Sequence, residues 1–198
     1  GCYKIGLTCS ENYFIAKPGQ FIMLRLAQQS DPLLRRPFSI HNLIISNGQA
    51  GGLELLYKVV GKGTAIMARQ KPGDRVDILG PLGTGFIIPR QAKSIHVVAG
   101  GIGVAPLLFL VSQLCRDNYD FSNSRVFIGG RSKEDLLCRD DFVQLGLKVD
   151  TTTDDGSAGD QCLVTHPLEL AADHNPPDMI VACGPMAMLA CVIGIAEK

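Results

Sequence analysis

The sequence has no tryptophan, few aromatic residues and no excess of charge of either sign. Its 19 basic and 19 acidic residues balance, whereas nucleic-acid-binding proteins are typically basic. A net charge near zero also gives no electrostatic reason to expect a membrane partner. The longest apolar run, residues 102–111, is too short to span a bilayer, and Pro106 interrupts it. We therefore expect a globular protein of one or two domains that binds neither nucleic acid nor membrane.

The chain also lacks cysteines at metal-binding spacing. It contains no CxxC pair, and an odd number of cysteines scattered through apolar stretches does not indicate a disulfide framework. We expect reduced thiols in a cytoplasmic protein and no metal site made by this chain alone. No signal segment is present, and the start at Gly1 without Met suggests a trimmed sequence. The cysteines are Cys2, Cys9, Cys115, Cys138, Cys162, Cys183 and Cys191.

The sequence pattern changes near residue 90. Before it, short β-rich runs are separated by turn signals such as Asn47-Gly48, with one short helix predicted at residues 64–70. After it, predicted strands alternate with predicted helices, which indicates a parallel sheet with crossover helices. The fold class is thus a two-domain β-barrel plus α/β protein, with an antiparallel barrel in residues 1–89 and a parallel-sheet domain in residues 90–198. The predicted strands are residues 21–26, 38–45, 53–60, 75–79, 94–99, 125–128, 147–152 and 179–182. The later helices are residues 104–115 and 185–196, and residues 133–145 are expected to be helical in parts.

In the first half, Arg36-Pro37-Phe38-Ser39 begins a predicted strand. A guanidinium can bind a pyrophosphate bidentately, and Phe38, on the same strand face, can lie against a flat aromatic ligand. The alternative for these residues alone is an edge strand with a surface arginine and a core phenylalanine.

Leu56-Tyr57-Lys58 precedes Gly61-Lys62-Gly63-Thr64 in the same half. Glycines allow close approach of the backbone to a ligand, and helix-start amides with the Thr64 hydroxyl suit a phosphate. The loop is no Walker A motif, because Gly63 follows Lys62. Taken alone, a glycine hairpin capped by Thr64 is the better interpretation.

In the second half, residues 99–106 lie between a predicted strand and a predicted helix, where a dinucleotide-binding turn belongs. Pro106 replaces the usual third small residue, and no acidic residue clearly ends the following strand. Arg131 stands near that strand end and could meet a 2′-phosphate.

Cys183-Gly184-Pro185 and Asp154-Asp155-Gly156-Ser157 each follow a predicted strand as well. Ligands of open α/β sheets bind beyond the carboxyl ends of the strands, so these residues would face the crevice that Gly101 faces. A buried small residue before a helix, and a polar turn, are the respective alternatives.

Together and in this order, these motifs resemble the ferredoxin–NADP reductase superfamily, and most closely the electron-transfer subunit of heteromeric, NAD-using dihydroorotate dehydrogenases. The likeness covers nearly the whole chain. It is carried by Arg36-Pro37-Phe38-Ser39, Val59-Val60-Gly61-Lys62-Gly63-Thr64, Leu79-Gly80-Pro81-Leu82-Gly83, residues 100–106, Thr153-Asp154-Asp155-Gly156-Ser157 and Ala182-Cys183-Gly184-Pro185.

The resemblance implies FAD in the barrel and NAD in the α/β domain, with hydride passing from nicotinamide C4 to flavin N5 where the domains meet. No side chain of the chain is expected to be catalytic, since the flavin carries the chemistry. The implied FAD-binding residues are Arg36, Pro37, Phe38, Ser39, Leu56, Tyr57, Lys58, Gly63 and Thr64. The implied NAD-binding residues are Gly101, Gly103, Val104, Ala105, Pro106, Asp155, Cys183, Gly184 and Pro185.

The resemblance also implies a partner, an FMN-dependent dihydroorotate dehydrogenase subunit in a heterotetramer that serves pyrimidine biosynthesis. Electrons would leave through a [2Fe-2S] centre held by cysteines downstream of Cys183-Gly184-Pro185, but the sequence ends at Lys198 before any such cluster. We expect a truncated sequence, with a branch lacking the cluster as the alternative. Rival functions are the flavin reductase subunit of a hydrogenase, a ferredoxin:NAD(P)H oxidoreductase or other self-contained NAD(P)H reductase, and a non-catalytic binding module of the same fold.

Overall fold

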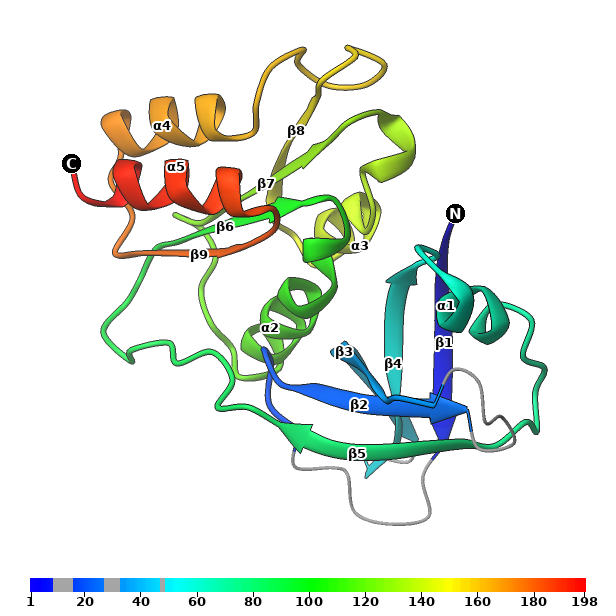
Figure 1. Ribbon diagram of the computed structural model, residues 1–198. Coiled ribbons are helices and arrows are strands. Elements are labelled where there is room, and N and C mark those ends of the chain that lie inside the picture. The colour runs from blue at the N-terminus through cyan, green and yellow to red at the C-terminus, as the bar shows by residue number, and fades with distance from the viewer. Residues whose placement is uncertain (9–15, 27–32, 47–48) are drawn as a thin grey trace. The chain divides into compact units, whose positions relative to one another are not determined.

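The computed structural model describes residues 1–8, 16–26, 33–46 and 49–198 (Figure 1). Two features named from the sequence, Cys9 and the Asn47-Gly48 turn, lie outside these residues. The chain divides into two compact units, Gly1–Phe86 and Ile87–Lys198, and each has its own sheet.

The first unit is built on a five-stranded antiparallel sheet in the order β1-β4-β3-β2-β5. The strands are β1 (Cys2–Thr8), β2 (Phe21–Leu26), β3 (Arg36–Ser46), β4 (Gln49–Lys58) and β5 (Val76–Leu82), and the short helix α1 (Lys62–Met67) follows β4. Among the described residues no pairing joins β1 to β5, so the strand pairing does not close into a complete barrel.

Alternation of apolar and polar residues gives this sheet its inner face. On β2, Ile22, Leu24 and Leu26 are buried while the residues between them are half-buried. Leu53 and Leu55 of β4 are buried in the same way. Successive side chains of a strand point to opposite faces, so these residues form one core face. The α1 residue Met67, also buried, adds to the core of this unit.

The second unit has a four-stranded parallel sheet in the order β8-β7-β6-β9. The strands are β6 (Ile95–Gly100), β7 (Arg125–Gly130), β8 (Lys148–Thr153) and β9 (Met179–Cys183). The helices are α2 (Val104–Arg116), α3 (Arg139–Gln144), α4 (Thr165–His174) and α5 (Met186–Ala196). The first five residues of β6 are buried, as expected for a central strand covered on both faces.

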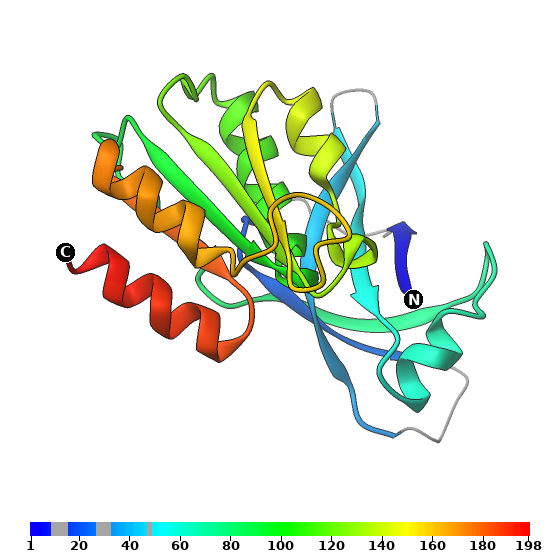
Figure 2. The ribbon, with the colours of Figure 1, turned by 90° about the horizontal axis from the view of Figure 1, so that it is seen from above.

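Helices lie on both faces of this parallel sheet (Figure 2). On one face, Leu168 of α4 and Val192 of α5 pack in a cluster with Val98 and Phe127 of the sheet. Helices α2 and α3 contact the sheet and each other on the opposite face. Because all four strands are parallel, their carboxyl ends share one edge, which is where open α/β sheets bind ligands.

The predicted fold class is confirmed: an antiparallel sheet comes first and a parallel sheet with crossover helices follows. Most predicted bounds lie within a few residues of the observed ones, although the helix predicted at 64–70 spans Lys62–Met67. Helix α4 was not predicted from the sequence. None of the helices in the described ranges is long and apolar enough to cross a membrane.

Candidate functional site

The start of β3 and the start of α1 meet in the first unit through Arg36 and Gly63. The Arg36 side chain lies so close to Gly63 that a Cβ there would come within 2.6 Å of the Arg36 Nε. Arg36 also donates a hydrogen bond to the Leu34 carbonyl. Arg36, Phe38 and Gly63 line one small hollow together with Met67. The glycine is therefore needed at this point to leave room for the guanidinium.

The Thr64 hydroxyl is used inside its own loop. It accepts hydrogen bonds from the backbone N–H groups of Val60 (3.0 Å) and Gly61 (3.2 Å) and donates one to the Gly61 carbonyl (3.0 Å). Thr64 is also buried. Its side chain thus holds the shape of the glycine loop through these three hydrogen bonds. Contact of this hydroxyl with a phosphate stays a prediction.

Three aromatic rings, from β1, β4 and β3, contact one another across the sheet of the first unit. Tyr57 stacks on Tyr3 with ring centroids 5.9 Å apart, and Phe38 meets Tyr57 edge-on at 5.8 Å. Tyr57 is only 3% exposed, and its hydroxyl has no hydrogen-bond partner among the described residues. Burial, and then the neighbouring Tyr3, raise the pKa of Tyr57, so the phenol stays protonated and can donate a hydrogen bond.

The remaining first-unit residues predicted to bind FAD are more accessible. Pro37 and Lys58 are exposed, and Ser39 and Leu56 are half-buried. Ser39 pairs with Phe21 across β2 and β3, on the strand face opposite to Phe38. The structure brings Arg36, Phe38 and Gly63 together, while Ser39 belongs to the other face of the sheet.

In the second unit, the turn after β6 packs directly against the turn after β9. A Cβ on Gly103 would lie 2.2 Å from the Cys183 carbonyl oxygen, and one on Gly100 would lie 2.7 Å from the Pro185 ring. A Cβ on Gly184 would lie 3.0 Å from the Gly100 nitrogen. Glycines at these three positions therefore allow two strand-end loops to pack backbone to backbone.

Gly101 differs from the glycines around it. Its φ is +53°, a left-handed conformation that favours glycine, and no atom lies within 4 Å of where its Cβ would be. The residues that follow, Val104, Ala105 and Pro106, are buried in the first turn of α2. At this turn the open surface is thus backbone, and the side chains of residues 104–106 serve the core.

Cys183 and Asp155 stand at different strand ends of the same sheet edge. Cys183 pairs with Ala99 and lies beside the glycine turn, and burial raises the pKa of its thiol, which keeps it neutral. The Asp155 N–H donates to the Arg131 carbonyl (3.2 Å), so Asp155 follows β8 and neighbours the end of β7. Hydrogen bonds from Ser157 hold the pKa of Asp155 below its usual value. The structure thus brings Gly101, Gly103, Cys183, Gly184 and Pro185 together at the ends of β6 and β9, and leaves Asp155 at the other side of the sheet, after β8.

The ion cluster of Arg25, Arg35 and Asp77 in the first unit was not predicted from the sequence. Arg25 and Asp77 are opposite residues on β2 and β5, and a cross-strand pair of opposite charge is the signal that could have found it. Within the described ranges no three histidine, cysteine or acidic residues gather as a metal site, and none of the cysteines there forms a disulfide.

Known protein families match both units. The model of the oxidoreductase FAD-binding domain matches residues 2–87, and that of the oxidoreductase NAD-binding domain matches residues 97–193. A relative from Clostridium acetobutylicum, named dihydroorotate dehydrogenase B (NAD(+)) electron transfer subunit, is 34% identical over the whole of this chain and 72% of its own length. The chain belongs to the ferredoxin reductase family. The resemblance found from the sequence motifs is thereby confirmed.

Other members of the ferredoxin reductase family are longer than this chain. A relative of the same name from Desulforamulus reducens is 44% identical over 88% of this chain, which spans 64% of that relative. Among solved structures, an NADH-dependent reduced ferredoxin-NADP oxidoreductase aligns with a TM-score of 0.81 at 27% identity, over 100% of this chain and 68% of that one. Phthalate dioxygenase reductase aligns with a TM-score of 0.75 at 20% identity, over 100% of this chain and 60% of that one, which indicates a shared fold.

The residues of both units suit the two cofactors of the family. In the first, Gly63 leaves room for a cationic side chain, and the buried Tyr57 hydroxyl lacks a partner among the described residues. In the second, Gly101 presents open backbone at the carboxyl edge of a parallel sheet. A phosphate-rich, aromatic ligand needs such a cation and such exposed N–H groups.

Proposed function

We propose that this chain is the FAD- and NAD-binding part of an electron-transfer subunit that passes electrons between NAD(H) and a partner dehydrogenase. Its work in that role is to bind and orient two cofactors. When bound, FAD would exchange a hydride with a nicotinamide and single electrons with a partner. The observation that carries the proposal is the presence of both cofactor-binding domains in one chain, at residues 2–87 and 97–193.

For the first unit we propose that Arg36 binds the FAD pyrophosphate, because it is the cation that lies over Gly63. Gly63 allows that approach, and Thr64 fixes the loop through the Gly61 carbonyl. Ser39 and the half-buried Leu56, with exposed Pro37 and Lys58, would line the flavin from the other strand positions. Phe38 and Tyr57, both buried, support this site from the core.

For the second unit we propose that NAD binds at the glycine turn after β6. Backbone N–H groups near Gly101 and Gly103 would hold the pyrophosphate, while residues 104–106 fix the turn from the core. Cys183, Gly184 and Pro185 lie beside this turn and would line the nicotinamide end. Asp155, near Arg131, would meet the adenosine end, since β7 and β6 lie between β8, which it follows, and β9, which carries Cys183.

We further propose that the electrons come from dihydroorotate oxidation by an FMN-dependent catalytic subunit in a heterotetramer, in the cytoplasm. Support comes from relatives named dihydroorotate dehydrogenase B (NAD(+)) electron transfer subunit in several organisms. This chain spans 64% of the length of the first of these relatives. Among the residues described here, no group of histidine, cysteine and acidic side chains could hold a [2Fe-2S] centre.

The first experiment is anaerobic stopped-flow reduction of the FAD-loaded protein by NADH and by NADPH. We expect rapid loss of the oxidised flavin absorption band with NADH. A protein that never acquires that band, even after incubation with FAD, would be a non-catalytic binding module, and the proposal would be wrong.

A second experiment identifies the electron source. Full-length protein copurified with its catalytic subunit should reduce NAD when dihydroorotate is added, while the chain alone should not. The alternative, a ferredoxin:NAD(P)H oxidoreductase or hydrogenase subunit, is favoured by the 27% identity to the NADH-dependent reduced ferredoxin-NADP oxidoreductase. Reduction of NAD by reduced ferredoxin but not by dihydroorotate would support that alternative.

A further inference from the structure

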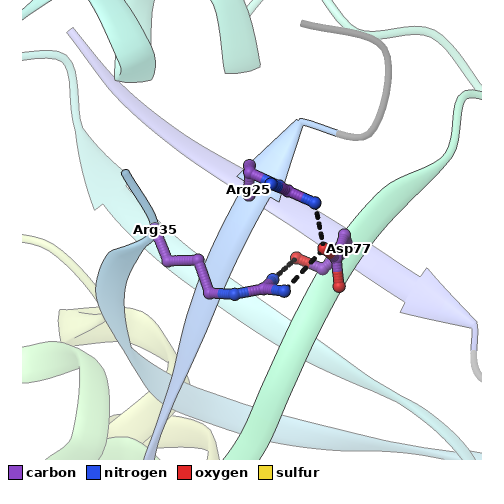
Figure 3. Close-up of polar contacts among 3 residues, drawn as sticks. All are labelled: Arg25, Arg35 and Asp77. Atoms are coloured by element: carbon purple, nitrogen blue, oxygen red, sulfur yellow. Dashed lines mark hydrogen bonds and ion pairs between the residues drawn. The ribbon is translucent and has the colours of Figure 1, made fainter. Parts of the chain in front are cut away.

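Two arginines of the first unit share a single carboxylate, that of Asp77 on β5 (Figure 3). Arg25 of β2 lies 2.9 Å from the Asp77 Oδ2 through one guanidinium nitrogen. Arg35 lies 2.7 Å from the same oxygen through Nη2 and donates to the Asp77 backbone carbonyl through Nη1 (3.3 Å). Arg35, more than Arg25, holds the pKa of Asp77 below its usual value, so the carboxylate stays ionised.

The two arginines cannot have the same task, because only one of them lies in a strand paired with β5. Arg25 is directly opposite Asp77 in the ladder that joins β2 and β5, so the Arg25–Asp77 pair supports strands that backbone hydrogen bonds already hold. Arg35 precedes the first residue of β3, and its two contacts with Asp77 tie that entry point to β5. Two contacts from the planar guanidinium, one to the Asp77 carboxylate and one to its backbone carbonyl, restrict the direction of the Arg35 side chain as well as its distance from β5.

Arg35 is the immediate neighbour of Arg36, whose guanidinium lies over Gly63. In an extended chain, consecutive side chains point to opposite faces, so holding Arg35 toward Asp77 on one face directs Arg36 to the other. Arg36 pairs with Leu24, a core residue of β2, which places it on the face that Gly63 approaches. The ion cluster and the Arg36 side chain thus lie on opposite faces of the chain where it enters β3.

We propose that Arg35 and Asp77 are positioning residues that hold the entry of β3 so that Arg36 is presented to the pyrophosphate of FAD. This inference rests on the proposed function of Arg36 in FAD binding. It assigns Arg25, which shares the carboxylate, to the sheet and not to the site.

The test compares Arg35→Gln with Arg25→Gln, two variants that remove the same charge from the same carboxylate. Apoprotein is titrated with FAD, and the dissociation constant is read from the quenching of flavin fluorescence. Arg35→Gln should raise the dissociation constant roughly threefold to thirtyfold, as for directly coupled neighbours, and Arg25→Gln less than about twofold. Equal effects of the two variants would overturn the positioning role. If Arg35→Gln does not fold, Asp77→Asn replaces it, with the same expectation.

Repeating Arg35→Gln in an Arg36→Ala background separates positioning from simple structural damage. With Arg36 removed there is nothing to position, so Arg35→Gln should cause no further loss of FAD affinity. A full additional loss would overturn the inference while leaving the FAD site in place. If Arg36→Ala alone left FAD affinity unchanged, the proposed FAD site itself would be wrong, and the inference would be lost with it.

Discussion

At the scale of single residues, Gly63 offers the sharpest test of the FAD site. Gly63→Ala places a methyl group 2.6 Å from the Arg36 Nε, so the guanidinium must move away. Because Gly63 lies within α1, the alanine should also stabilise the helix, by about 0.5–1 kcal/mol. We therefore expect weaker FAD binding in a protein that is no less stable, measured by FAD titration and thermal unfolding.

Gly61 gives a matched control for this substitution. Its φ is −176°, an extended conformation open to any residue, and no atom lies within 4 Å of an added Cβ. Gly61→Ala should leave FAD affinity unchanged. If Gly61→Ala weakened binding as much as Gly63→Ala does, loop flexibility rather than the Arg36 contact would be the cause.

Gly103 tests the second site at the same scale. Its added Cβ would lie 2.2 Å from the Cys183 carbonyl oxygen and 2.6 Å from the Cys183 carbonyl carbon, and backbone cannot swing aside as a side chain can. We expect Gly103→Ala to lower the melting temperature and weaken NADH binding, with FAD affinity unchanged, as isothermal titration would measure. Gly194→Ala in α5, where a Cβ meets no atom within 4 Å, is the control. Loss of FAD instead of NADH would mean that the two sites are interchanged.

At the scale of elements, Asp178 joins the starts of β6 and β9. Its Oδ2 accepts hydrogen bonds from the backbone N–H groups of Lys93 (2.8 Å) and Ser94 (3.0 Å), and these hold the Asp178 pKa below its usual value. A lowered pKa in the folded state contributes stability above the unfolded pKa of about 3.9, and that contribution is lost as the pH falls through the folded value. The Asp178→Asn protein should therefore have a lower free energy of unfolding than the wild type at pH 7. On acidification its free energy of unfolding should fall by less than that of the wild type.

Urea unfolding of both proteins between pH 7 and pH 3 measures this difference. The gap in unfolding free energy between wild type and Asp178→Asn should narrow below about pH 4. Asp173→Asn, which removes an exposed carboxylate from α4, should leave the pH dependence as it is in the wild type. A gap that stays constant with pH would show that the bonds to Lys93 and Ser94 do not depend on the charge.

The elements also show what sequence could predict and what it could not. Strand β6 was predictable because Ile95 and the run Val97–Ala99, interrupted only by His96, precede a glycine turn, a pattern typical of a central parallel strand. Helix α4 was missed because its apolar residues do not follow a clear helical period: Leu168 and Ala171 are buried, but Leu170 is exposed. Two buried positions give only a weak helical periodicity.

The same limit applies to the sites. Alternation along a strand places Arg36 and Phe38 on one face, but it does not say that this face is the core, where Phe38 packs on Tyr57. The motif at Thr64 predicts a hydroxyl near a loop, whereas the contacts of that hydroxyl depend on where Val60 and Gly61 fold. The Arg35–Asp77 pair joins residues far apart in the chain, and neither has a motif that names its partner.

At the scale of the whole molecule, two units with separate sheets should respond separately to their ligands. A ligand that binds only the folded form stabilises it by about 2.7 kcal/mol at a hundred times its dissociation constant. In calorimetry we expect FAD to raise the transition of the first unit and NAD that of the second. Because Gly103 packs on Cys183 within the second unit, Gly103→Ala should lower the transition that NAD raises and leave the FAD-sensitive one in place. If FAD raised the transition that Gly103→Ala lowers, the assignment of FAD to the first unit and NAD to the second would be wrong.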